Sequence, residues 1–279
     1  MTNRLLLIVF LNLLVVTAFG QDISRQEADS MLYALDKSKP DLDRIDLLLN
    51  LAQFHIFKPG EFQIDFDSAM VYINQAKVLN RTLKSSDADG YALLTESILV
   101  REKGLKDEAK KMTEKAIKIL EFGTNKFYLA VGYYELAFYY DFNQREELLQ
   151  KIQLVEKSVK LFQQTGTTKK KARALEMLGD LFDANDEPSK AISVLQEAQA
   201  AYEILKEPNL QGVYVILGRV YYSKSDFGQS LFYLLKALKT AHAQGDTSMQ
   251  LCNINNSLVG LYSAIGNYEM STKYLQEAL

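Results

Sequence analysis

The stretch ALEMLGDLFDANDEPSKAISVLQEAQAAY, residues 174–202, decides the fold, because a second stretch repeats its pattern 39 residues later. Residues 213–241, VYVILGRVYYSKSDFGQSLFYLLKALKTA, carry the same features in the same order. Each copy has Leu-Gly, then an aromatic residue, a small residue and an Ala at 3, 12 and 19 positions after the Gly, namely Gly179, Phe182, Ala191 and Ala198, and Gly218, Tyr221, Ser230 and Ala237. Self-similarity at such a period predicts a repeat architecture.

Weaker copies fall into register on both sides of these two. The small-residue position, which Gly179 and Gly218 occupy in these two copies, recurs at residues 52, 97, 137, 179, 218 and 259, with spacings of 45, 40, 42, 39 and 41 residues. We therefore expect about six repeats of roughly 40 residues, near residues 41–83, 87–121, 127–163, 169–205, 209–243 and 248–279.

Each copy is predicted to be a pair of amphipathic helices, because apolar residues recur at three- and four-residue intervals. Small residues are expected where the two helices cross, and stacking of the pairs buries the remaining apolar faces. The pattern resembles the tetratricopeptide repeat (TPR), an L-G-x2-Y helix followed by an A-x3-F helix. This resemblance implies an all-α, helical-hairpin solenoid, wound as a right-handed superhelix whose first helices line the concave surface.

The N-terminal 40 residues are expected to form two further segments. Arg4, the apolar run Leu5–Val16 and the ending Thr17-Ala18-Phe19-Gly20 predict a secretory signal peptide over residues 1–20. The alternative, an uncleaved membrane anchor, is disfavoured because the run is shorter than the ~20 residues of a membrane span. Within residues 21–40, Ser24-x-x-Glu27 predicts a capping box that opens an N-terminal capping helix.

At the other end, the sequence stops inside the second helix of the sixth pair. Because solenoids need a terminal element with a polar outer face, we expect the protein to continue beyond Leu279. The alternative is that the last helix serves as its own cap.

Composition and motifs argue against several functions. A net charge of −3 gives no electrostatic basis for nucleic-acid binding, and two His with one Cys disfavour a metal centre or a disulfide framework. Nucleotide-binding and hydrolase motifs are absent, so we expect no catalytic residue, no cofactor and no metal. The basic run Lys169–Arg173 is interpreted as a solvated helix face, His55 as an interhelical contact, and Asp183–Glu187 as a turn.

The resemblance implies a protein or peptide ligand in the concave groove, so the inward positions of the first helices are the candidate binding residues. They are apolar or aromatic in the first half of the chain and charged in the second, namely Leu94, Ile98, Arg101, Tyr134, Phe138, Arg173, Asp180, Arg219 and Tyr222. Tyr134 and Phe138 are the best anchor candidates, since buried aromatic residues commonly carry interface energy. The alternative is that these rings pack against the next repeat.

The sequence thus predicts an exported, non-catalytic module for protein–protein interaction or sensing. It is similar to the extracytoplasmic TPR region of bacterial TPR-containing sensor histidine kinases, which implies a two-component kinase domain beyond Leu279. The expected location is the periplasm or the extracytoplasmic face of the inner membrane, with membrane contact only through the signal peptide or a later transmembrane segment. A free-standing periplasmic scaffold for envelope or secretion components, and more remotely an unrecognised hydrolase, are the alternatives.

Overall fold

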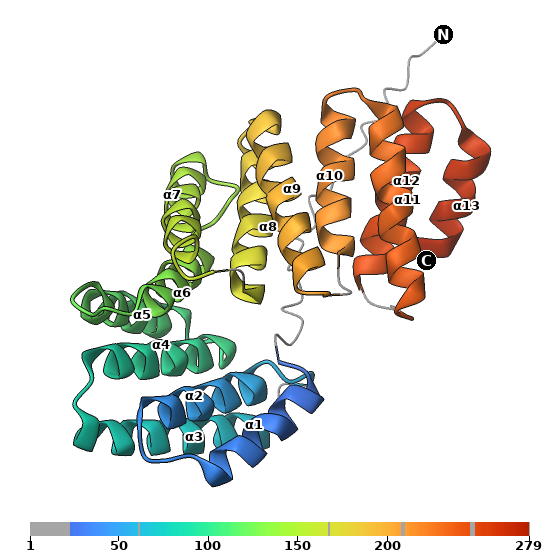
Figure 1. Cartoon of the computed structure of the whole chain (residues 1–279). Coiled ribbons are helices and arrows are strands. Elements are labelled where there is room, and N and C mark those ends of the chain that lie inside the picture. Colours follow the sequence, from blue (N-terminus) through green and yellow to red (C-terminus); the bar gives the residue numbers. More distant parts are fainter. Residues whose placement is uncertain (1–22, 61, 167, 208–209, 246–248, 279) are drawn as a thin grey trace.

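The structure, a computed structural model, describes residues 23–60, 62–166, 168–207, 210–245 and 249–278; the predicted signal peptide lies outside them. Within this part every regular element is helical (Figure 1). The elements are α1 (Arg25–Lys37), α2 (Leu42–Ile56), α3 (Gln63–Leu83), α4 (Ser86–Glu102), α5 (Lys106–Glu121), α6 (Lys126–Leu136), the 3-10 helix η1 (Ala137–Tyr139), α7 (Arg145–Phe162), α8 (Lys169–Ala184), α9 (Pro188–Ile204), α10 (Gln211–Ser223), α11 (Phe227–Ala243), α12 (Met249–Ala264) and α13 (Tyr268–Ala278).

From α2 onward the helices pack as six consecutive hairpins, which agrees with the predicted repeat number. Small residues lie where the two helices of a hairpin cross, as expected. A Cβ added at Gly179 would be 2.4 Å from Cγ of Leu195, and one at Gly218 would be 2.7 Å from Cγ of Leu234. The helices therefore approach so closely that a larger side chain would displace a buried leucine.

The helix α1 precedes the hairpins and begins at the predicted capping box. The Glu27 backbone N–H donates to Oγ of Ser24 (3.2 Å), and the Ser24 N–H donates to Oε2 of Glu27 (2.6 Å). Two free N–H groups of the first turn are thereby satisfied. Ala28 and Leu35 are buried, which seats α1 on the first hairpin.

The hairpins curve with their first helices on the inside. Contacts join α2 to α4, α4 to α6, α8 to α10 and α10 to α12, whereas the second helices of neighbouring hairpins make no contact of similar extent within the described residues. We call the surface formed by α2, α4, α6, α8, α10 and α12 the inner face. Because the first helices lie closer together than the second ones, this face is the concave side.

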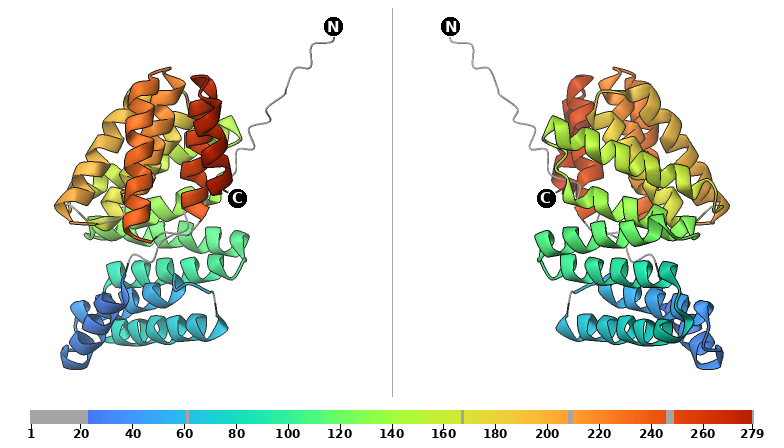
Figure 2. Two further views of the ribbon diagram at one scale, coloured as in Figure 1. Left: turned by 90° about the vertical axis from the view of Figure 1, so that its right-hand side faces the viewer. Right: turned by 90° about the vertical axis from the view of Figure 1, so that its left-hand side faces the viewer.

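The inner face is interrupted between the third and fourth hairpins. The helix α6 is short and passes into η1, and among the described residues it makes no extended contact with α8. The molecule is therefore divided into an N-terminal arc (α1–α6 with η1) and a C-terminal arc (α8–α13), with α7 between them. Figure 2 shows the helices of the N-terminal arc lying across the direction of those in the C-terminal arc. No helix in the described part of the chain is both long enough and apolar enough to cross a membrane.

Candidate interaction site

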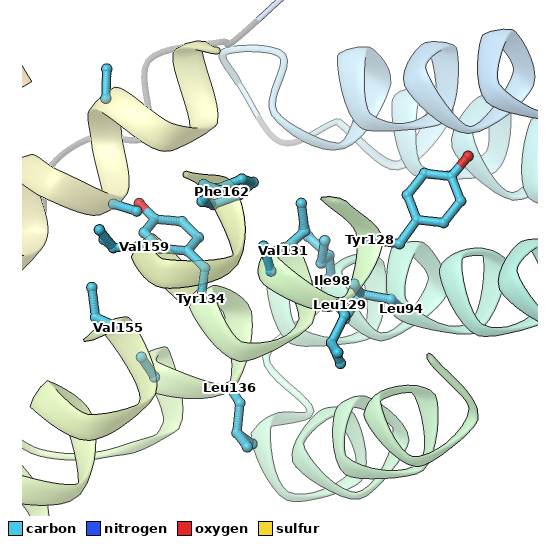
Figure 3. Close-up of a cluster of buried hydrophobic side chains, with 14 of the residues drawn as sticks. Leu94, Ile98, Tyr128, Leu129, Val131, Tyr134, Leu136, Val155, Val159 and Phe162 are labelled. Atoms are coloured by element: carbon cyan, nitrogen blue, oxygen red, sulfur yellow. The ribbon is translucent and has the colours of Figure 1, made fainter. Parts of the chain in front are cut away.

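In the N-terminal arc the inner face is filled by its own side chains. Leu94 and Ile98 of α4 are 0% and 1% exposed, and Tyr134 of α6 is 7% exposed. Figure 3 shows Leu94 and Ile98 close to Val131, while Tyr134 lies beside Val159 of α7. These three side chains form the core between successive helices, so the prediction that they contact a partner is wrong.

Aromatic stacking explains why this arc is closed. The rings of Tyr91 in α4 and Tyr128 in α6 are stacked, with centroids 4.1 Å apart and planes 6° apart. Nε2 of Gln53 in α2 donates to the Tyr91 hydroxyl (2.8 Å), and the Tyr128 hydroxyl donates to the Asp46 carboxylate. Burial raises the pKa of Asp46 although the bond from Tyr128 opposes the shift. These contacts link the three first helices α2, α4 and α6.

Arg101, near the end of α4, lies against Phe138 of η1, where α6 ends. Arg101 pairs with Glu135 (Nη1–Oε2 2.6 Å) and Glu102 (Nη2–Oε1 2.9 Å), and its guanidinium lies over the Phe138 ring at 5.0 Å. Phe138 also meets the Tyr134 ring edge to face, with centroids 5.2 Å apart. The two predicted anchor rings thus pack on each other, on Arg101 of the preceding repeat and on α7 of their own repeat. These contacts are internal to the protein, although the alternative that the sequence left open was packing against the next repeat.

The C-terminal arc presents a different inner face. Arg219 of α10 reaches α8, where its Nε donates to Oδ2 of Asp183 (3.1 Å) and its Nη2 contacts Asp180. The side chains of Arg219 and Asp180 are 38% and 40% exposed, so this ion pair is open to solvent. Arg173 and Tyr222 are partly buried on the same two helices. Four of the predicted residues, Arg173, Asp180, Arg219 and Tyr222, therefore share one polar surface.

More deeply buried polar groups lie beneath this surface, between α8 and α9. The Tyr202 hydroxyl of α9 donates to Oε2 of Glu176 (2.8 Å). Burial raises the pKa of Glu176, and burial also raises the pKa of Asp183 against the opposing effect of Arg219. Gly212 makes room for the carboxylate, since a Cβ there would be 2.1 Å from Oε1 of Glu176. The carboxylates are thus held partly dehydrated beside the guanidinium groups, a setting that strengthens their interaction with a ligand.

Amide side chains continue the polar surface towards the last hairpin. On α12, Asn256 is exposed and Asn253 is partly buried, and Nε2 of Gln211 in α10 donates to Oε1 of Gln250 (3.4 Å). Amides offer both donors and acceptors, which suits the backbone of an extended peptide. Within the described residues no group of three or more His, Cys, Asp and Glu is placed to hold a metal ion.

The lysines of the basic run have a role that the sequence did not reveal. Nζ of Lys169 contacts Oε1 of Glu27 in α1 (3.1 Å) and Oε1 of Glu207 (2.7 Å), and Nζ of Lys170 donates to Oε1 of Gln53 in α2 (3.0 Å). These contacts tie the start of the C-terminal arc to the start of the N-terminal arc beside a pocket of about 210 Å³. The solvated-face interpretation is therefore wrong for these two side chains.

Two smaller interpretations are confirmed. Nδ1 of His55 in α2 lies 3.3 Å from Oδ1 of Asp65 in α3, and its ring stacks on Tyr72 with centroids 5.7 Å apart, so His55 is an interhelical contact. Residues 185–187 form the turn between α8 and α9, with Asp186 at a φ of 58°, whereas Asp183 and Ala184 of the predicted turn belong to α8.

No protein-family model matches the chain, and no curated protein matches its sequence. Solved structures match the fold. BtubC from P. vanneervenii superposes with a TM-score of 0.61 at 17% identity, covering 76% of this chain and 87% of that one. A Rap protein complexed with competence and sporulation factor gives 0.62 at 15% identity, covering 94% and 71%.

A signal transduction ATPase with a tetratricopeptide repeat sensor, from Pyrococcus horikoshii, gives a TM-score of 0.60 at 10% identity, covering 91% of this chain and 39% of that one. Such low identities establish likeness of fold and leave function to be argued from the site. The chain has the fold of a TPR-type helical-hairpin solenoid.

Proposed function

We propose that this chain is an exported sensory module, the input region of a two-component histidine kinase-like protein, which binds a peptide or protein ligand on the inner face of its C-terminal arc. The observation that carries the proposal is the contrast between the two arcs. Large rings fill the inner face of the N-terminal arc, whereas the C-terminal arc exposes Asp180 and Arg219 by about two-fifths.

The chemistry of the C-terminal inner face fits an extended peptide. Tyr222 offers an aromatic surface, Asn256 offers an amide, and Arg219 with its two aspartates offers charges of both signs within one helix spacing. Aromatic and Arg side chains are enriched among the residues that dominate binding energies. A ligand with polar backbone groups and at least one charged side chain would match these groups.

Two structural neighbours support this choice of ligand and role. One Rap structure is complexed with competence and sporulation factor, and the Pyrococcus horikoshii protein is described as carrying a tetratricopeptide repeat sensor. Both descriptions concern those proteins. They show that this fold serves in ligand complexes and in sensors, which is the role proposed for this chain.

A binding experiment tests the site. Peptides selected by display against the purified chain are titrated by calorimetry into wild type and into the double variant Tyr222→Ala/Asn256→Ala. We expect affinity to fall by about tenfold or more, equivalent to about 1.4 kcal/mol. The matched control is Leu149→Ala, an exposed residue of α7 away from the inner face, which should bind like wild type. Equal affinity of the double variant would exclude this surface as the site.

A fusion experiment tests export. Residues 1–24 are fused to alkaline phosphatase, whose disulfides form only in an oxidising compartment. The fusion should be active, and interrupting the apolar run with Leu7→Arg and Leu13→Arg should abolish that activity. An inactive wild-type fusion would contradict export. A scaffold role would instead be indicated if the chain were exported, bound several envelope proteins at once and had no linked kinase whose activity responds to ligand.

A further inference from the structure

The outer face of α3 carries an exposed aliphatic ridge. Ile64, Val71 and Val78 are 72%, 54% and 58% exposed, and seven residues separate each from the next. That spacing places the three side chains along one line of the helix, over about 21 Å at 1.5 Å per residue. We call these three residues the α3 ridge; α3 lies at the free end of the N-terminal arc (Figure 1).

The ridge has no role in holding the arc together. The opposite side of α3 supplies Phe66, Ala69, Ile73 and Ala76 to the buried core, so the arc already has its apolar contacts. β-Branched residues are also poorer helix formers than the polar residues common on helix surfaces. Contiguous apolar surface marks sites that contact other molecules, and these three aligned side chains would supply the apolar part of such a site.

Four polar residues beside the middle of the ridge mirror each other about Val71, and Asp67 is the one charged residue among them. On one flank lie Asp67 and Asn74, and on the other lie Ser68 and Gln75, all of them hydrogen-bonding side chains at the surface. On each flank, the polar residue before Val71 therefore has a polar counterpart at a similar distance after Val71. Along the ridge itself, Ile64 and Val78 each lie seven residues from Val71, so apolar corresponds to apolar.

We infer that the α3 ridge is a self-association face, on which α3 of a second copy packs antiparallel about a two-fold axis at Val71. The two-fold axis brings each residue of the ridge and its flanks opposite a residue of similar polarity on the second copy. Val71 then meets Val71 of the second copy, and Ile64 meets Val78. Asp67 accepts hydrogen bonds from the amide of Asn74, and Ser68 pairs with Gln75. No like charges face each other, and the same patch serves both copies, as a two-fold interface requires.

The size of the ridge sets the strength of the dimer. A contact one helix wide buries less than the roughly 1,200–2,000 Å² of a standard stable interface. The dimer is therefore reversible and forms at high local concentration. It leaves the inner face of the C-terminal arc free, so self-association and ligand binding at the proposed site can be measured separately.

Charge-swap pairs test the two-fold contact. Sedimentation velocity is measured on the full chain from low micromolar to near-millimolar concentration, for wild type, Val71→Glu and Val71→Lys. Each variant places two like charges at the axis and should weaken the dimer by about tenfold or more. An equimolar mixture of the two variants brings Glu against Lys and should restore dimerisation. Ile204→Glu, at an aliphatic position of α9 that is 70% exposed, is the control and should dimerise like wild type.

Three results would overturn the inference. Wild type could remain monomeric at the highest concentration, the single variants could dimerise undiminished, or the mixture could fail to recover the dimer. Binding of the ridge to lipid vesicles by a monomeric wild type would likewise replace a second copy with a membrane. Circular dichroism checks that each variant keeps its helices, which is expected because Val71 is mostly in solvent.

Discussion

The two arcs are built from the same hairpin, yet one has a filled inner face and the other an open one. In the N-terminal arc the inward positions carry Tyr91, Leu94 and Tyr128, which stack or pack across neighbouring first helices. In the C-terminal arc the inward positions that Ile98 and Phe138 hold in the N-terminal arc carry Asp180 and Arg219, which meet as an exposed ion pair. The repeat pattern therefore sets the hairpin, while the inward side chains decide whether a groove remains.

The largest expected loss of stability comes from truncating a buried side chain between the two arcs. Tyr134→Ala should lower the free energy of unfolding by about 3–5 kcal/mol, since truncating a buried aromatic ring leaves a cavity. This differs from the sequence-based expectation that Tyr134 is an anchor for a partner. Tyr222→Ala, on the open inner face, should cost clearly less. Urea titrations followed by circular dichroism measure both, and equal costs would remove the distinction between the arcs.

Overpacking a helix crossing should have the next largest effect. Gly179→Leu places a side chain where Leu195 already lies and should cost about 1–3 kcal/mol. Gly228→Leu is the matched control in the same arc, because a Cβ there would meet only Oδ1 of Asp226 at 3.7 Å. The control should be neutral or mildly stabilising, as Leu is the better helix former. Equal melting temperatures for both variants would contradict the crossing.

A smaller, pH-dependent effect is expected below the open inner face. Because burial raises the pKa of Glu176, the folded state binds that proton more tightly than the unfolded state does. This group's contribution to stability is therefore greatest in acid and falls as pH rises from about 4.5 through the raised pKa. Glu176→Gln should melt above wild type at pH 7, with the gap closing towards pH 4. A gap that widens in acid would reverse the assignment.

The smallest energetic effect is expected at the tie between the arcs. Lys169→Met removes two partly exposed ion pairs, which contribute about 0–1 kcal/mol each. The arcs should nevertheless separate, and small-angle scattering should report a larger radius of gyration than wild type. Lys190→Met, which breaks an ion pair with Glu187 three residues away, should leave the radius unchanged. An unchanged radius in Lys169→Met would show that the ion pairs of Lys169 are not needed to hold the arcs together.

Local sequence patterns predict most of the fold and part of the candidate site. Gly179, Gly218 and the Ser24–Glu27 box act on neighbours within one hairpin or one turn, so their roles follow from spacing. The helix break at Ala137–Tyr139 does not, because the helical apolar pattern continues through it and the break depends on packing with Arg101 and α7. The burial of Leu94 likewise depends on how tightly successive first helices stack, which a single-sequence pattern does not encode.

The tie from Lys169 to Glu27 also bears on how the chain folds. An open solenoid has only nearest-neighbour terms, so its ends can unravel one repeat at a time. A contact between residues 142 positions apart adds a term that no single repeat can form alone. It raises the contact order and makes α1 and the fourth hairpin depend on each other. Fraying should therefore begin at α13, which has no such tie among the described residues, and hydrogen exchange should slow towards the N-terminal arc.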